Sequence, residues 1–365
     1  MDLINTQYRY NFVDTQNELE QFLDLIEENS TVAIDTEFER KDTYFPILSI
    51  VQIAYENTQN EKFIAIIDVL SNLDLSRFFA IIANPKIIKI LHSSTQDLQI
   101  FYHIYKIWPE NIFDTQIIAN FCDQDYNVSL FNLVKNQCDF ELNKAMQSSD
   151  WIKRPLSSSQ IKYAINDVLF LHQIYKNFNN ILRAKNRQDW AKEEMDNFIK
   201  RILQKDIEHI FKKFSKKGLN TLEIAKLYQI IQLREDYAKQ LNVPREHLFK
   251  NEEIFQILKN NFKDFNKILL KTDFFKTLEE ILINDKIIVD LKREVGLNET
   301  EIKQFDKIKS MVAKFSKKEN IAPQFLVNSE MLKQIILAKN PKEILNNWRY
   351  SILGSQIQQI LSLIK

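Results

Sequence analysis

Glycine is nearly absent from this chain of 365 residues, which has glycines only at Gly218, Gly296 and Gly354. The GxGxxG and Walker loops that bind nucleotide phosphates need closely spaced glycines, and so does the GxSxG turn of many serine hydrolases. The sequence therefore excludes these three classes of site. It also excludes a helicase accessory module, and it predicts no nucleotide cofactor.

Cysteines and long apolar runs are equally scarce. Cys122 and Cys138 have neither CxxC spacing nor nearby histidine ligands, which argues against a disulfide framework and a structural zinc site. No stretch approaches the roughly 18 apolar residues of a membrane span, and the opening residues lack the basic and apolar regions of a secretory signal. We therefore expect a cytoplasmic protein that does not associate with membranes. We also expect it to be a monomer.

The net charge is zero, but the two halves of the chain carry opposite charge. Residues 1–200 contain 19 Lys/Arg and 28 Asp/Glu, a net charge of −9, and residues 201–365 contain 30 and 21, a net charge of +9. Such asymmetry indicates a charged partner. The first half would supply cation-binding carboxylates and the second a surface that binds phosphates. The alternative is that scattered solvated charges produce the difference.

The first half has the pattern of an α/β domain. Short β-branched runs bounded by polar residues predict strands at 31–38, 47–55, 62–70 and 86–94. Helical spacing predicts helices at 14–28, 75–82, 95–105 and 129–138. Ser158 or Ser159 is expected to cap one long closing helix over 161–185. The predicted domain spans residues 1–195.

The second half is predicted to be entirely helical, because every segment from Ile207 onward repeats its apolar residues with a period near 3.6. Two stretches share one plan, in which a short loop ends at an N-capping residue, around Asn251 and around Asn328. This weak repeat of about 75–80 residues predicts two small helical domains, at 208–288 and 289–365.

Several acids have the spacing of a metal site. Asp35 and Glu37 lie two apart in an apolar strand and so share one face, where two carboxylates repel unless a cation lies between them. Asp97 lies near the start of a predicted helix, where stabilisation of the helix N-terminus also explains it. Tyr163 and Asp167 are one helical turn apart and share a face. Each pattern is common by itself, and together they favour a catalytic site.

The order of these motifs resembles the tyrosine-containing branch of the DEDD 3′→5′ exonucleases, and within it the bacterial ribonuclease D family. The resemblance is carried by DTEFER at 35–40 with Tyr44, LSIVQIA at 48–54, LH at 91–92 with Asp97, FDTQ at 113–116, and DWIKRPL at 150–156 with Tyr163 and Asp167. In the helical half, LRE at 233–235, VPR at 243–245 and LFKNE at 248–252 resemble an HRDC domain, although Leu233 replaces the usual aromatic residue. FLVN at 325–328 with NWR at 347–349 resembles a second, more divergent copy.

The resemblance implies a fold and an activity. The fold would be a ribonuclease H-like mixed-sheet domain followed by two HRDC-like domains. The activity would be that of an exoribonuclease that trims single-stranded 3′ ends, including those of tRNA precursors, and releases 5′-mononucleotides. Two ions of Mg²⁺ or Mn²⁺ would be the cofactors.

The resemblance also implies roles for individual residues. The metal ligands would be Asp35, Glu37, Asp97 and Asp167, of which Asp35 would bind both ions, and Tyr163 would orient the attacking water. The substrate would be contacted by Thr36, Phe38, Gln52, His92 and Arg154. For Phe38, stacking on the terminal base competes with a simple place in the core. Arg154 would contact phosphate.

Two other functions remain open from the sequence. The same catalytic domain occurs in enzymes that degrade DNA, so an exonuclease with DNA preference is one alternative. A non-catalytic scaffold that binds nucleic acid is the other, although all four acids and the tyrosine are present.

Overall fold

The computed structural model describes residues 8–142, 149–203, 207–259, 272–286 and 296–363. The chain forms two compact units. The first consists of Met1–Glu37, Leu48–Lys200 and Val295–Lys365, and the second of Phe38–Ile47 and Arg201–Glu294. The predicted boundary between residues 288 and 289 lies outside the described residues, and the proposed division into three domains stays a prediction.

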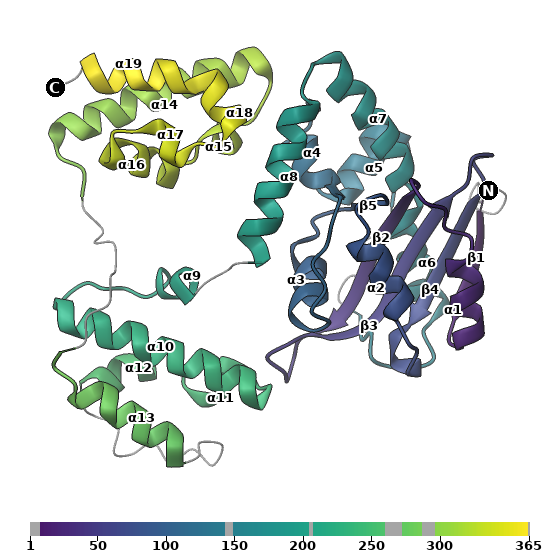
Figure 1. Cartoon of the computed structure of the whole chain (residues 1–365), viewed down its shortest axis with the longest axis horizontal. Coiled ribbons are helices and arrows are strands. Elements are labelled where there is room, and N and C mark those ends of the chain that lie inside the picture. Colours follow the sequence, from purple (N-terminus) through teal and green to yellow (C-terminus); the bar gives the residue numbers. More distant parts are fainter. Residues whose placement is uncertain (1–7, 143–148, 204–206, 260–271, 287–295, 364–365) are drawn as a thin grey trace. The chain divides into compact units, whose positions relative to one another are not determined.

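A six-stranded mixed sheet forms the centre of the first unit (Figure 1). Its order is β1-β4-β3-β2-β5-β6, in which β4 runs antiparallel to β3 and the pairs β1–β4, β2–β5 and β5–β6 are parallel. The strands are β1 (Tyr8–Val13), β2 (Thr31–Glu39), β3 (Ile47–Glu56), β4 (Lys62–Asp68), β5 (Ile88–Leu91) and β6 (Ile112–Asp114). Apolar side chains of the central strands, such as Ile34, Ile53 and Ile66, are completely buried. The mixed-sheet fold is confirmed.

Helices pack around this sheet, with α6 against β4 and α7 against β5. The helices of this part are α1 (Gln16–Leu23), α2 (Ser76–Ala83), α3 (Thr95–His103), α4 (Thr115–Ala119), α5 (Leu130–Cys138), α6 (Ser158–Leu169), α7 (Leu171–Ala184) and α8 (Gln188–Leu203), with a short 3₁₀ turn at Val69–Ser71.

Three local features differ from the sequence prediction. Strands β1 and β6 were not predicted, because β1 is largely solvent-accessible and lacks clean alternation, and β6 has only three residues. The predicted closing helix is two helices. At Phe170 the backbone N–H donates to the carbonyl of Val168 and not to the residue four positions back, which ends α6.

The helical half contains two modules of the same plan. The elements of the first are α9 (Ile207–Phe211), α10 (Thr221–Leu241), α11 (Arg245–Leu248), α12 (Asn251–Leu258) and α13 (Thr272–Ile283). Those of the second are α14 (Glu299–Glu319), α15 (Pro323–Leu326), α16 (Ser329–Ala338), α17 (Pro341–Ile344), α18 (Asn347–Arg349) and α19 (Ser355–Leu363), with a π turn at Tyr350–Gly354.

The repeat is visible in the helix caps. Both α10 and α14 have 21 residues and begin with a capping box, formed by Asn220 with Glu223 in one and by Asn298 with Glu301 in the other. Asn328 caps α16 as predicted, but Asn251 does not cap α12. Lys250 precedes that helix, and the Asn251 side chain instead accepts a hydrogen bond from Arg234 at 3.0 Å.

The second unit includes the whole connection between β2 and β3, together with the last two residues of β2 and the first residue of β3. The Tyr44 hydroxyl donates to the buried Glu235 carboxylate at 3.1 Å, and the Phe45 backbone N–H donates to the Asn242 side chain at 3.1 Å. Arg245 lies 3.3 Å from Glu235 and balances its charge. Phe38–Ile47 is therefore part of the helical unit, although it is continuous with the strand that carries the first two acids.

The second module packs against α8 within the first unit. Glu194 of α8 is 2% exposed and accepts hydrogen bonds from Arg349 and, at 3.1 Å each, from the Trp348 indole and the Asn346 amide. The Phe121 ring contacts the Trp348 ring edge to face, with centroids 5.2 Å apart. These contacts make the last helices a structural part of the unit that holds the acids.

Candidate active site

Three acids from two elements converge on one point. Alternation along β2 puts Asp35 and Glu37 on the same face, and α6 brings Asp167 to them. Ligand oxygens of the three side chains lie within 4.8 Å of one another. That spacing is short enough for one cation to bind all three carboxylates.

The fourth acid is connected to the same strand by a hydrogen bond. Asp97, in the first turn of α3, is 6% exposed and accepts from the hydroxyl of Thr36, the residue between Asp35 and Glu37. Burial raises the pKa of Asp97 to about 6, although the hydrogen bond from Thr36 opposes the shift. Thr36 thus holds Asp97 close to the other acids.

The electrostatics of this cluster favour bound positive charge. Burial and then repulsion from the three neighbouring acids raise the pKa of Asp35 well above its usual range. Burial, followed by repulsion from Asp167 and Asp97, raises the pKa of Glu37 to about 9. Burial raises the pKa of Asp167 to about 8, and its Oδ2 is buried without a hydrogen-bond partner among the described residues. Hard oxygen ligands that repel one another fit a divalent cation.

Tyr163 lies one turn before Asp167 on the same face of α6 and is half-buried. Burial, and then repulsion from Asp167, Glu37 and Asp35, raises the pKa of the phenol above its usual range. The hydroxyl is therefore protonated at neutral pH, which suits a group that orients water and argues against a general base.

The start of α6 is fixed by a capping box. Ser157, and not Ser158 or Ser159, caps the helix, and Gln160 completes the box. The Gln160 amide also donates to the carbonyl of Asp150 at 3.0 Å. This bond joins the helix that carries Tyr163 to the segment before it.

The residues expected to contact substrate have different surroundings. Gln52 is completely buried, and neither of its side-chain polar atoms has a partner among the described residues, so direct contact with a substrate has no support. The Nδ1 atom of His92 lies 2.8 Å from the Thr115 hydroxyl. Phe38 is half-buried, with the Arg40 guanidinium 6.0 Å from its ring centre.

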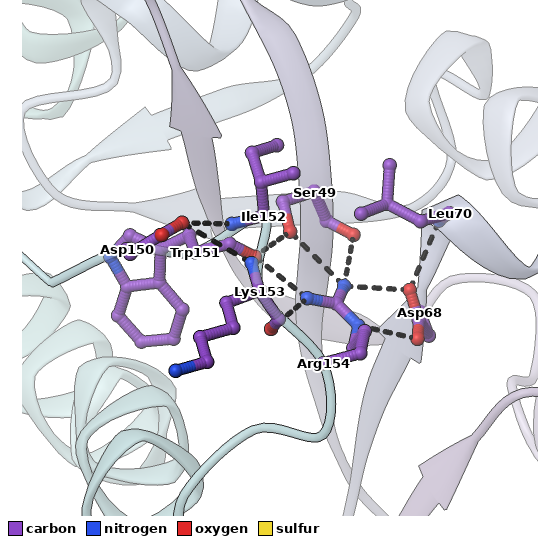
Figure 2. A network of polar contacts seen from close by, with 8 residues as sticks. All are labelled: Ser49, Asp68, Leu70, Asp150, Trp151, Ile152, Lys153 and Arg154. Atoms are coloured by element: carbon purple, nitrogen blue, oxygen red, sulfur yellow. Dashed lines mark hydrogen bonds and ion pairs between the residues drawn. The ribbon is translucent and has the colours of Figure 1, made fainter.

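Arg154 binds protein acceptors through all three of its guanidinium nitrogens (Figure 2). Its main partner is Asp68, at the end of β4, with two contacts of 2.7 Å. The predicted phosphate contact is therefore not supported by this geometry. The sequence analysis did not single out Asp68 as a functional residue. The feature that could have indicated it is its place as an acid at the end of a largely apolar strand.

Known relatives match nearly the whole chain, and a family model matches its first half. A family model described as a 3′-5′ exonuclease matches residues 10–183. A ribonuclease D of Bartonella henselae is 30% identical over 362 residues, which is 94% of this chain and 88% of the relative. A ribonuclease D of Haemophilus influenzae is 27% identical, with 90% and 84% covered.

A solved structure shows the same fold over the same extent. Escherichia coli RNase D, described as an exoribonuclease involved in structured RNA processing, matches with a TM-score of 0.81 at 21% identity, covering 97% of this chain and 99% of its own. Among the described residues, no helix has the length and apolar character needed to cross a membrane.

The fold, the acid cluster and the extent of the match to the Bartonella relative all indicate the same family. Such a cluster in this family implies the use of a divalent metal. The chain belongs to the ribonuclease D family of 3′→5′ exoribonucleases.

Proposed function

We propose that this chain removes nucleotides one at a time from single-stranded 3′ ends of RNA, including those of tRNA precursors, and releases 5′-mononucleotides. The observation that carries the proposal is the convergence of Asp35, Glu37 and Asp167, with Asp97 held beside them through Thr36. We further propose that it acts as a cytoplasmic monomer without a nucleotide cofactor.

The acids would hold Mg²⁺ or Mn²⁺, because both prefer oxygen ligands and leave positions open for water and phosphate. Asp35, Glu37 and Asp167 would bind one ion, and Asp35 with Asp97 the other. The chemistry that the ions supply when bound is activation of the attacking water and stabilisation of charge on the leaving 3′-oxygen. The protein's own part is to hold four carboxylates at fixed positions on β2, α3 and α6.

Tyr163 would orient the attacking water through its protonated hydroxyl. The raised pKa of the phenol supports this role, because the proton stays on the oxygen at the pH of the cell. Phe38 follows Glu37 directly on β2, and we propose that its ring contacts the terminal base, since stacking suits any base of a single strand. His92 stays a proposed substrate contact on resemblance alone.

The positive half of the chain would bind the body of the RNA. Its net charge of +9 compensates the −9 of the half that carries the acids. Two groups of lysines are candidates for phosphate contacts. The first group is Lys212, Lys213, Lys216 and Lys217, and the second is Lys314, Lys317 and Lys318.

A time course of degradation tests the proposal. The full chain is incubated with 3′-extended tRNA, single-stranded RNA or single-stranded DNA of matched length, with Mg²⁺, with Mn²⁺ or with chelator. Metal-dependent shortening of both RNAs from the 3′ end, with 5′-mononucleotides as products, is expected. Faster loss of the DNA would support the DNA exonuclease instead, and no shortening under any condition would support the scaffold.

Variants connect this activity to the acids. Asp35→Asn, Asp97→Asn and Asp167→Asn should each abolish turnover, because they share the ions. Asp196→Asn, on the exposed side of α8, is the matched control and should retain full activity. Residual turnover above a few per cent in the first three, at unchanged thermal stability, would contradict the assignment.

A further inference from the structure

The segment that precedes α6 is held by one arginine. The Arg154 guanidinium donates from Nε and Nη2 to the two carboxylate oxygens of Asp68, each at 2.7 Å. Nη2 also donates to the Ser49 hydroxyl at 3.1 Å, and Nη1 donates to the Trp151 carbonyl at 2.7 Å. Figure 2 shows these groups around the guanidinium, with Asp68 on one side, Trp151 on the other and Ser49 above.

This arrangement has little capacity left for a substrate. Nη1 makes a further bond to the Lys153 carbonyl at 3.1 Å, and Nη2 another to the Ser49 carbonyl at 3.3 Å. The five N–H groups of a guanidinium are therefore matched by acceptors of the protein itself. The Arg154 side chain is 25% exposed and Asp68 only 7%, so the bidentate pair is mostly shielded from water.

Trp151 connects this network to the tyrosine. Its carbonyl accepts from both Arg154 and the Ser49 hydroxyl, which fixes the backbone at that residue. Trp151 is 3% exposed, and the centroid of its ring lies 6.0 Å from that of the Tyr163 ring, with an angle of 45° between the ring planes. The indole Nε1 is buried without a hydrogen-bond partner among the described residues. No side-chain hydrogen bond of Trp151 can therefore replace the two hydrogen bonds that its backbone carbonyl accepts.

We propose that Arg154 is a positioning residue for Tyr163, acting through Trp151. The pair with Asp68 fixes Arg154 to the sheet, Arg154 fixes the Trp151 backbone, and the Trp151 ring supports one side of the tyrosine. Gln160 adds a second connection, from α6 to the Asp150 carbonyl. The inference rests on the proposed role of Tyr163 in orienting water.

The proposal predicts a defect in turnover and not in RNA binding. A small displacement of a group that orients a reactant can lower the rate by about 10²-fold. Arg154→Gln removes the charge and most of the bonds, so kcat should fall by roughly 10- to 100-fold while KM for single-stranded RNA changes less than about twofold. A phosphate contact would instead raise KM and flatten the salt slope of binding by about 0.7.

Arg154→Lys separates the two roles further. Lysine retains the positive charge and can still bind phosphate, but one ammonium cannot bridge Asp68, Ser49 and Trp151 as the guanidinium does. The proposal therefore expects kcat to stay low in this variant. Recovery of kcat and KM to wild-type values would overturn it.

A double-mutant cycle with Tyr163→Phe is the decisive test. If Arg154 acts through the tyrosine, Arg154→Gln should lower kcat much less when the hydroxyl is already absent. The same fold-loss in both backgrounds would show a general structural effect and overturn the inference. If Tyr163→Phe alone leaves the chemical rate unchanged, the proposed role of Tyr163 fails. That result differs from equal losses in the two backgrounds, which would refute only the connection between Arg154 and Tyr163.

Two further variants provide a matched control and a replacement in case Arg154→Gln does not fold. Arg77→Gln is the matched control, because Arg77 also contacts two acids, Glu20 and Asp24, but on the surface. It should leave kcat unchanged. If Arg154→Gln does not fold, as judged by thermal unfolding, Ser49→Ala replaces it in the cycle. Ser49→Ala removes only the hydroxyl contacts, and it should show a smaller loss with the same non-additivity.

Discussion

Binding of a divalent metal should release protons, because the acids that would bind it hold protons in the metal-free protein at neutral pH. With pKa values of about 9 for Glu37 and about 8 for Asp167, these two groups together carry about two protons at pH 7. A metal ligand must be deprotonated, so binding displaces those protons. The raised pKa of Asp35 adds to the number.

Calorimetry measures this release directly. Mn²⁺ or Mg²⁺ is titrated into the metal-free protein at pH 7 in buffers that differ in ionisation enthalpy, and the slope of observed enthalpy against that enthalpy gives the proton number. We expect at least about two protons per protein. Asp167→Asn should lower the number by about one or more, because it removes one acid and weakens the repulsion that raises the pKa of Glu37.

The sign of the pH dependence follows from the same shifts. Metal affinity should increase as the pH rises towards 8–9 and then level off, once the two carboxyls are ionised. A carboxyl whose pKa is higher in the folded than in the unfolded state stabilises the fold at a pH below its unfolded pKa of about 4. This stabilisation is lost as the pH rises to the pKa of the folded state. Metal should therefore raise Tm more at pH 9 than at pH 6. Release of fewer than about 0.5 protons at pH 7 would refute the reasoning.

Three further predictions concern other parts of the chain. Tyr163→Phe should still bind metal and RNA but lose rate by roughly 10²–10⁴, as measured by single-turnover kinetics, and an unchanged rate would remove the hydroxyl from the mechanism. Glu194→Ala should lower the free energy of unfolding by about 3–5 kcal/mol in a denaturant titration, because Arg349, 7% exposed, would lose its buried partner; a decrease below about 1 kcal/mol would contradict that pairing. The third variant replaces four lysines by glutamine, at Lys212, Lys213, Lys216 and Lys217. It should weaken RNA binding and flatten the dependence of log affinity on log salt by about 0.7 for each phosphate that the protein no longer neutralises. An unchanged slope would exclude these lysines as phosphate contacts.

The lysine substitution is a sharper test of RNA binding than deletion of the helical half. A deletion of residues 208–365 would also remove Asn346, Trp348 and Arg349, whose side chains donate hydrogen bonds to Glu194. The shortened chain would then expose the Glu194 carboxylate together with apolar rings that pack against this module, such as Phe121, and weaker binding could reflect poorer folding. Surface lysines can be replaced without exposing that carboxylate.

Features that depend on local pattern could be predicted from the sequence. The strands β2 to β5 have apolar β-branched runs, and their period of two also places Asp35 and Glu37 on one face. The four-residue spacing of Tyr163 and Asp167 gives their common face on α6 in the same way. The chemistry of the site therefore follows from short segments, and only their order along the chain connects them.

Features that depend on distant partners could not be predicted in this way. Tyr44 was noted only as part of a motif, but its hydroxyl binds Glu235, 191 positions later, and this contact belongs to the helical unit. The cap of α12 was misplaced by one residue because Asn251 is a good capping type, yet its side chain binds Arg234. In both cases a tertiary hydrogen bond decides the outcome.

Arg154 shows the same limit at the active site. An arginine in a nuclease motif indicates phosphate binding, since a guanidinium pairs with phosphate as well as with carboxylate. Which of the two it binds depends on whether a carboxylate is already in reach, and Asp68 is 86 positions away in sequence. Because β3 and β4 are paired with Ile50 opposite Asp68, the acid and Ser49 come together at the segment that contains Trp151. The register of two strands therefore brings a carboxylate within reach of this arginine, and that carboxylate is the group it binds.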